Sequence, residues 1–172
     1  PLASPGACCS SLTSCSVAIL VEAPATFSPL CDFTATLVLH QAGSSYGVGW
    51  YNAPAPGPPS LADIHVVVPP GTPVGTTITG SQIKSDPAYA GGDVGFALVG
   101  GQTHYSEYQW NPGFTNIFDF FCSAPGTPWK LAVIYASGIT PNAYYLAFED
   151  GDVACNDFGN DGDFNDYVFL FT

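Results

Sequence analysis

The chain has 172 residues, of which 14 are acidic and only two are basic (both Lys), so its formal net charge is −12. Because basic side chains neutralise phosphates and attract anionic lipid surfaces, this composition argues against nucleic acid or an acidic membrane surface as a partner. The apolar stretch Val17–Val21 near the amino terminus is far too short to span a bilayer. Apolar residues make up 47% of the chain and charged residues only 9%, so we expect one folded domain with a sizeable core.

Short runs rich in Val, Ile, Thr and aromatic residues predict strands, whereas helix signals are nearly absent. Gly and Pro separate almost all of these runs. About ten such strands with regular turns are typical of an all-β domain, a single β-sandwich or jelly roll. In chain order the predicted strands are Val17–Ala23, Phe33–His40, Tyr46–Tyr51, Ile64–Pro69, Gly75–Gly80, Val94–Val99, Asn116–Phe121, Trp129–Ala136, Ala143–Glu149 and Tyr167–Phe171.

Three patterns constrain how these strands are arranged. The odd-numbered residues of Phe33–His40 are apolar, so that side of the strand is expected to face the core. The runs Tyr144–Phe148 and Tyr167–Phe171 are apolar on both faces, which predicts central strands or strands that lie against a partner. The Pro-rich stretch Ala53–Ser60 could link two small domains, but neither side has an independent composition, so we interpret it as a loop.

The six cysteines include no CxxC pair and no Cys/His metal spacing, so they predict a disulfide framework and an oxidising, extracellular compartment. We expect a Cys-rich amino-terminal segment, residues 1–16, followed by a β-sandwich domain over residues 17–172. The pairing stays open, and an intermolecular bridge from the amino-terminal cysteines is one alternative. The chain starts without a signal-peptide pattern, as a secreted protein does after cleavage.

Half of the acidic residues lie close together near the carboxyl end. Two carboxylates about 5 Å apart repel each other by roughly 3 kcal/mol at an effective dielectric constant near 20. A converging set must therefore spread into water, take up protons or bind a cation. The set is Glu149, Asp150, Asp152, Asp157, Asp161, Asp163 and Asp166.

The spacing favours a cation. Asp161, Asp163 and Asn165 form a D-x-D-x-N pattern, the first half of a calcium loop with oxygen ligands at alternate positions. The second half of an EF-hand is missing, because Asp166 replaces the usual Gly and Thr172 the usual Glu. The remaining ligands must come from elsewhere.

The two strands that flank the acidic loop supply them. If Ala143–Glu149 and Tyr167–Phe171 pair antiparallel, Glu149 and Asp150 lie beside Asp163–Asp166 at the strand ends. This arrangement offers the six to eight oxygens that a calcium ion needs. The alternative is a solvated acidic loop that keeps the protein soluble. A calcium-binding β-roll is excluded because residues 159–163 contain only one such turn.

The closing segment resembles a known family, a calcium-binding carboxy-terminal domain of unknown function in secreted bacterial proteins, with the motif F-E-D…D-x-D-[YF]-N-D-h-h-F. The resemblance covers roughly residues 75–172 and includes weaker matches at Ile78–Ser81, Gly95–Val99 and Tyr105–Gly113. It implies an all-β, calcium-binding module attached to surface, adhesion or matrix functions. The ligands it implies are Glu149, Asp150, Asp161, Asp163, Asn165 and Asp166.

The sequence departs from the family pattern in three respects. The acidic loop contains Cys155 and an extra Asn156–Asp157, so a disulfide, for example to Cys122, would stiffen it. Family members often carry a sorting tail after this module, whereas this sequence stops at Thr172. Residues 1–74 resemble no family.

Catalysis is not favoured. His40, His65 and His104 are far apart in the sequence, and no nucleophile motif is present. Glu149 with an aspartate could form a glycosidase pair, but metal spacing explains the acidic residues better. A calcium-dependent carbohydrate-binding or adhesion module is the alternative to a structural role, with Tyr105, Tyr108 and Trp110 stacking on sugars.

The interpretation we favour is a non-enzymatic, secreted, calcium-stabilised structural protein of a cell-surface or matrix assembly. The sequence has almost no Lys to protect edge strands, so self-association through edge strands, including a filament formed by strand addition, is expected. The apolar run Ser16–Val21, behind the Cys-rich segment, is the candidate donor strand. In the competing interpretation, Val17–Val21 is an ordinary core strand of its own domain.

Overall fold

The computed structural model describes residues 18–21, 25–43, 45–111, 113–114, 127–151, 153–154, 157–158 and 161–172. These residues are mostly β, with one short α-helix, α1 (Gly80–Ser85), and the 3-10 turns η1 (Pro29–Cys31), η2 (Leu61–Asp63) and η3 (Tyr108–Trp110). The longer strands are β1 (Ala18–Val21), β2 (Thr34–His40), β3 (Gly47–Ala53), β4 (His65–Val68), β5 (Thr77–Thr79), β6 (Asp93–Val99), β7 (Thr103–Tyr105), β10 (Ala132–Ser137), β11 (Tyr144–Phe148) and β14 (Tyr167–Phe171).

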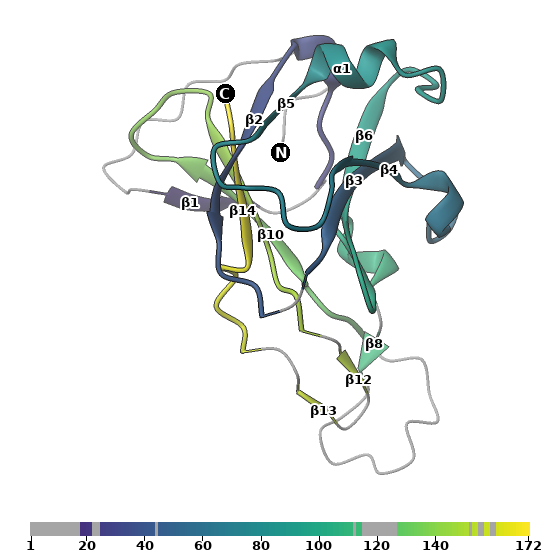
Figure 1. Ribbon diagram of the computed structural model, residues 1–172, viewed down its shortest axis with the longest axis vertical. Coiled ribbons are helices and arrows are strands. Elements are labelled where there is room, and N and C mark those ends of the chain that lie inside the picture. Colours follow the sequence, from purple (N-terminus) through teal and green to yellow (C-terminus); the bar gives the residue numbers. More distant parts are fainter. Residues whose placement is uncertain are drawn as a thin grey trace.

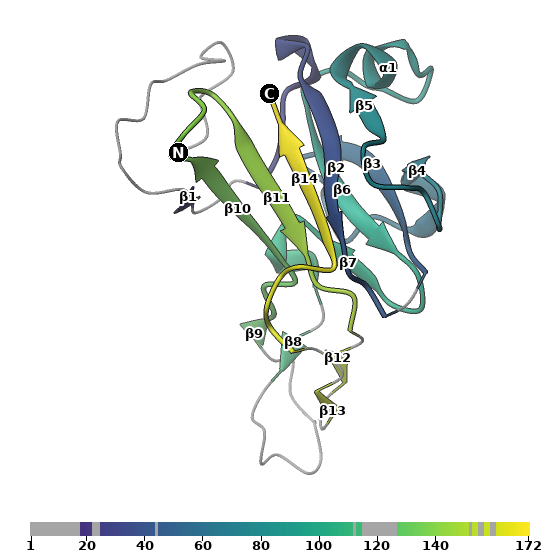
Figure 2. The ribbon, with the colours of Figure 1, turned by 60° about the vertical axis from the view of Figure 1, so that its left-hand side comes forward.

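The longer strands form two antiparallel sheets (Figures 1 and 2). One has six strands in the order β1-β10-β11-β14-β2-β5, and the other has four in the order β4-β3-β6-β7. Two two-residue pairs lie beyond one end of the sheets, β8 (Gly113–Phe114) with β9 (Thr127–Pro128) and β12 (Val153–Ala154) with β13 (Asp157–Phe158). The described residues are mostly β, as predicted, and the two sheets are consistent with the predicted β-sandwich.

One hydrophobic core joins the two sheets. The six-stranded sheet contributes alternate residues of β2, β11 and β14, and the four-stranded sheet contributes alternate residues of β3 and β6, as strand geometry requires. The inward side of β2 is as predicted, since Ala35 and Leu37 are fully buried whereas Val38 is exposed. Core residues come from both sides of the Pro-rich stretch 53–60, which is a loop between β3 and η2.

Strand β14 occupies a central position in the six-stranded sheet, between β11 and β2. The prediction that the two runs apolar on both faces are central strands is therefore confirmed for β11 and β14. Phe171 stacks on Phe27 with ring centroids 4.1 Å apart and contacts Phe33 and Phe96 at 5.1 and 5.5 Å. At the other end of β14, the Tyr167 hydroxyl accepts a hydrogen bond from the Tyr46 amide (3.0 Å) and donates one to its carbonyl (3.1 Å), which joins the two sheets.

The outer face of the four-stranded sheet has a smaller apolar cluster under the Pro-rich loop. The Tyr51 ring lies across Gly95 on the neighbouring strand, where a Cβ would come within 2.2 Å of the ring. Tyr105 packs edge-on against Tyr51 and donates a hydrogen bond from its hydroxyl to the Pro59 carbonyl at 2.7 Å. The loop is thereby held against the sheet.

The described residues contain elements that the sequence analysis did not predict, among them the two-residue strands β8, β9, β12 and β13. The sequence analysis missed β7, a three-residue strand between Gly-rich and Ser-containing turns, and it missed α1, whose first turn is closed by a capping box between Thr79 and Gln82. The strand predicted from Trp129 begins only at Ala132. The predicted segment 1–16 and the predicted strand Asn116–Phe121 lie outside the described residues.

Cys31 is disulfide-bonded, and the other five cysteines lie outside the described residues, so the predicted framework and any bridge between Cys122 and Cys155 stay predictions. Within the described residues, no helix has the length and apolar character needed to cross a membrane.

Candidate metal centre

The candidate site lies where β11 ends and β14 begins. These strands pair antiparallel, with Phe148 opposite Tyr167, so Glu149 leaves one strand beside the loop that leads into the other. The Glu149 amide donates to the Leu131 carbonyl at 3.0 Å, which extends the pairing with β10 by one residue. The predicted pairing of the two strands, and with it the predicted position of Glu149 beside the acidic loop, is confirmed.

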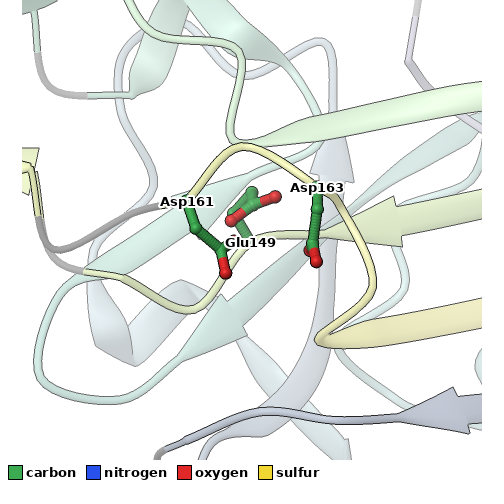
Figure 3. Close-up of side chains that lie close together, drawn as sticks. All are labelled: Glu149, Asp161 and Asp163. Atoms are coloured by element: carbon green, nitrogen blue, oxygen red, sulfur yellow. The ribbon is translucent and has the colours of Figure 1, made fainter.

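Three carboxylates converge at this point. Oxygen atoms of Glu149, Asp161 and Asp163 all lie within 4.8 Å of one another. Glu149 is only 1% exposed, whereas Asp161 and Asp163 are exposed. Figure 3 shows the Glu149 carboxylate between the two aspartates, which project from the loop ahead of β14. The three residues could hold a metal ion, because hard cations prefer carboxylate oxygens.

The loop conformation that permits this convergence depends on one strained residue. Phe164 has φ of 54°, in the left-handed region that a bulky side chain seldom adopts. Its backbone amide donates a hydrogen bond to Oε1 of Glu149, so the buried carboxylate stabilises the strained turn. Gly162, with φ of 76°, allows the other bend of the loop.

The other three predicted ligands make hydrogen bonds that organise the loop. Oδ2 of Asp166 accepts from the Asp150 amide at 2.7 Å, and its carbonyl accepts from the Gln41 amide at 3.0 Å. The Asn165 amide donates to Oδ1 of Asp163 at 3.1 Å, and its side-chain nitrogen donates to Oδ2. The structure therefore brings three of the six predicted residues together directly, and a ligand role for Asp150, Asn165 and Asp166 stays a prediction.

The electrostatics of the site disfavour four ionised carboxylates without a cation. Burial raises the pKa of Glu149, and the negative charges of Asp166, Asp161 and Asp163 raise it further. Burial is also the main reason that the pKa of Asp166 rises from 3.8 to about 6. Oε2 of Glu149 is buried and has no hydrogen-bond partner among the described residues. A divalent cation would supply this missing partner and compensate the negative charge.

Sequence reasoning missed His104, which lies directly beneath the site. Its Nδ1 is 2.5 Å from the Glu149 carbonyl oxygen, and its ring is completely buried. The imidazole therefore fixes the backbone from which the Glu149 side chain projects. No sequence signal connects the two residues, since they are 45 positions apart and meet only when the two sheets pack.

The raised pKa values predict that, in chelator, the protein becomes more stable as pH falls from 7 towards 5. Folded Asp166 takes up its proton near pH 6 and the unfolded residue near 3.8, so the folded state binds more protons between these values. Between pH 7 and pH 5 stability therefore rises, by about 1 kcal/mol from this residue. Denaturant unfolding at pH 5 and pH 7 measures the change.

Calcium is expected to weaken this pH dependence at neutral pH, because cation and protons compete for the same carboxylates. The control variant is Asp166→Asn, which should show a smaller gain on acidification in chelator. Loss of wild-type stability through the same pH window in chelator would contradict the prediction.

No family model, curated protein or solved structure was found to match the chain.

Proposed function

We propose that this chain is a non-enzymatic, extracellular calcium-binding structural protein, a subunit of a cell-surface or matrix assembly. The observation that carries the proposal is the convergence of Glu149, Asp161 and Asp163 around a buried carboxylate oxygen that has no described partner. The resemblance of residues 75–172 to a calcium-binding module of exported bacterial proteins supports the same function.

The donor set suits calcium better than zinc or copper. All three converging groups are carboxylates, without the thiolate or imidazole ligands that softer transition metals prefer. Calcium accepts six to eight oxygens in flexible geometry, so backbone carbonyls, water and the predicted ligands Asp150, Asn165 and Asp166 would complete the coordination. Magnesium requires a nearly ideal octahedral geometry and usually keeps several of its water ligands, so it is less suited to a set of several protein oxygens on a loop.

Calcium at this site would stabilise the strand that holds the six-stranded sheet together. Within the described sheet, β14 alone connects the β1-β10-β11 group with the β2-β5 pair. A cation bound by Glu149 after β11 and by Asp161 and Asp163 before β14 would fix the two strands at their shared end. Binding only to the folded state increases stability, which suits a protein that functions outside the cell.

Assembly by strand addition is the finer part of the proposal. The described edges are β1 and β5 of one sheet and β4 and β7 of the other. Edge strand β4 has the sequence His-Val-Val-Val, contains no Lys, and exposes about half of the Val66 side chain. Such an edge lacks the charges that usually prevent pairing between chains. In the other sheet, β1 pairs with β10 of the same chain. A β1 strand donated by a neighbouring chain would pair with β10 in the same register.

The alternative is a calcium-dependent carbohydrate-binding or adhesion module. Tyr108 is exposed on η3 and Trp110 is partly exposed, so these rings are the available candidates for stacking on a sugar. Tyr105 is buried and its hydroxyl is bonded to Pro59, which makes it the weakest of the three predicted contacts.

The deciding experiment is negative-stain microscopy of the purified protein in calcium and after chelation. We expect ordered polymers in calcium that loosen in chelator, because the metal stabilises the sheet whose edges associate. Monodisperse particles in both conditions would contradict the structural role and favour the carbohydrate-binding alternative.

A deletion of Ser16–Val21 tests whether this strand is donated to a neighbouring chain or belongs to the core of its own chain. A folded, monomeric product supports donation of this strand to a neighbour, whereas an unfolded product shows that the strand is part of the chain's own core. Val66→Lys is the control, because it charges the β4 edge and leaves the buried Val68 in place.

A further inference from the structure

A second candidate site lies under the Pro-rich loop, on the side of the four-stranded sheet. It is a pocket of about 550 Å³ that opens to solvent between β3, η2 and the start of β4. Its volume is within the range of small-molecule sites, about 300 to 1,000 Å³. It shares no lining residue with the acidic triad, and β4 and α1 lie away from the loop ahead of β14 in both ribbon views (Figures 1 and 2).

The walls of this pocket are fixed before any ligand arrives. Asn52 donates from its side chain to the Ala88 carbonyl at 3.0 Å and accepts from the Ala90 amide at 2.9 Å. The loop opposite is anchored by the bond from Tyr105 to the Pro59 carbonyl. Proline side chains lose almost no conformational entropy when they are covered, so a ligand would incur little ordering cost on this wall.

Asp63 and His65 line the pocket together with Asn52 and Tyr51. Oδ2 of Asp63 accepts from the Ser60 amide and hydroxyl at 2.9 and 2.6 Å, which orients the carboxylate and leaves Oδ1 without a described hydrogen bond. The His65 ring stacks on the buried Trp50 indole with centroids 4.6 Å apart, so its plane is also fixed. The pocket therefore combines a fixed hydrogen-bond acceptor, an imidazole and the C–H surfaces of Pro56, Pro58 and Pro59.

We propose that this pocket binds a neutral sugar ring, independently of calcium. A sugar presents hydroxyl donors at its rim and C–H groups on its face, which match a carboxylate beside proline rings. An anionic ligand is disfavoured, because the protein has a net charge of −12 and no lysine lines the pocket. This site is additional to the acidic centre, and it differs from the carbohydrate-binding alternative, in which the sugar depends on calcium.

The test measures binding of neutral monosaccharides (glucose, galactose, mannose and N-acetylglucosamine) and their disaccharides at millimolar concentration, in calcium and in chelator. We expect at least one sugar to bind with the same affinity in both conditions. Asp63→Asn keeps an oxygen acceptor for Ser60 but removes the charge that strengthens hydrogen bonds from sugar hydroxyls. The Kd of this variant for the sugar should therefore be at least tenfold higher than that of the wild type.

A second variant tests the position without changing charge. A Cβ at Gly57 would meet nothing within 4 Å, so Gly57→Phe is compatible with folding and puts a ring at the pocket wall. It should abolish binding, whereas Glu149→Gln should leave sugar binding unchanged and affect only the calcium response.

The proposal would be overturned if no sugar of the panel binds the wild-type protein, or if Asp63→Asn and Gly57→Phe bind like wild type. It would be overturned too if tetramethylammonium, a cation tested beside the sugars, binds and no sugar does. Binding that requires calcium and is lost in Glu149→Gln would also overturn it, because the sugar would then lie at the metal centre. Failure of the calcium response alone leaves the pocket result intact, so the two proposals are tested separately.

Discussion

Replacing Glu149 with Gln is expected to change the stability of the protein in opposite directions with and without calcium. In calcium the variant loses a charged ligand at the buried side of the site, and we expect a loss of about 2 to 4 kcal/mol, the size of the stabilisation that a well-occupied site provides. In chelator we expect a gain in stability, since burial raises the pKa of Glu149 and its ionised form is therefore disfavoured in the folded state. Thermal or denaturant unfolding in both conditions measures the reversal.

The amide substitution is suited to this test because it changes little else. Gln retains an oxygen that can accept the hydrogen bond from the Phe164 amide, so the left-handed turn keeps its partner. Asp163→Asn should show only half of the pattern, a loss in calcium with little change in chelator, because Asp163 is exposed. Asp93→Asn removes one charge from the start of β6 and serves as the control, with equal stability changes in both conditions.

An equal loss for Glu149→Gln in calcium and in chelator would contradict the ligand assignment. The charge of the carboxylate would then stabilise the fold without a cation. A calcium response that survives in both Glu149→Gln and Asp163→Asn would place the cation elsewhere in the chain.

The sequence was sufficient to predict that Glu149 lies beside the acidic loop, because the two strands that flank the loop are neighbours in the sheet. The continuous apolar run Tyr167–Phe171 predicted β14 with the bounds that the structure gives. The apolar run before Glu149 predicted β11, and two strands that flank one loop usually pair. The pairing then brings Glu149 beside Asp163 without further information.

What the sequence could not predict depends on contacts between distant segments. His104 lies under Glu149 only because β7 packs at the edge of the second sheet, and Thr103–Tyr105 is too short to give a periodic signal. The burial of Glu149 likewise results from the packing of both sheets, and it distinguishes this carboxylate from the exposed Asp161 and Asp163. The capping box of α1 was readable as Thr79-x-x-Gln82, but a six-residue helix leaves no room for an amphipathic pattern.

Replacing Phe171 with Ala is expected to destabilise the protein by about 3 to 5 kcal/mol, the range for a fully buried aromatic residue. The ring stacks on Phe27 and contacts Phe33 and Phe96, so its removal leaves a cavity lined by three aromatic side chains. Phe171→Leu is the milder variant in case Phe171→Ala does not fold, and Tyr108→Ala, on the exposed η3 turn, is the surface control. Denaturant unfolding in calcium and in chelator gives all values.

The comparison between the two conditions tests how calcium acts on β14. Phe171 lies at the opposite end of β14 from the acidic loop, and effects of substitutions at distant, independent sites add to within about 0.5 kcal/mol. If β14 is docked in both states, Phe171→Ala should therefore cost the same with and without calcium. A much smaller cost in chelator would contradict this expectation and show that β14 leaves the core when the cation is removed. Calcium would then be required to close the six-stranded sheet, since β14 alone joins its two halves in the described structure.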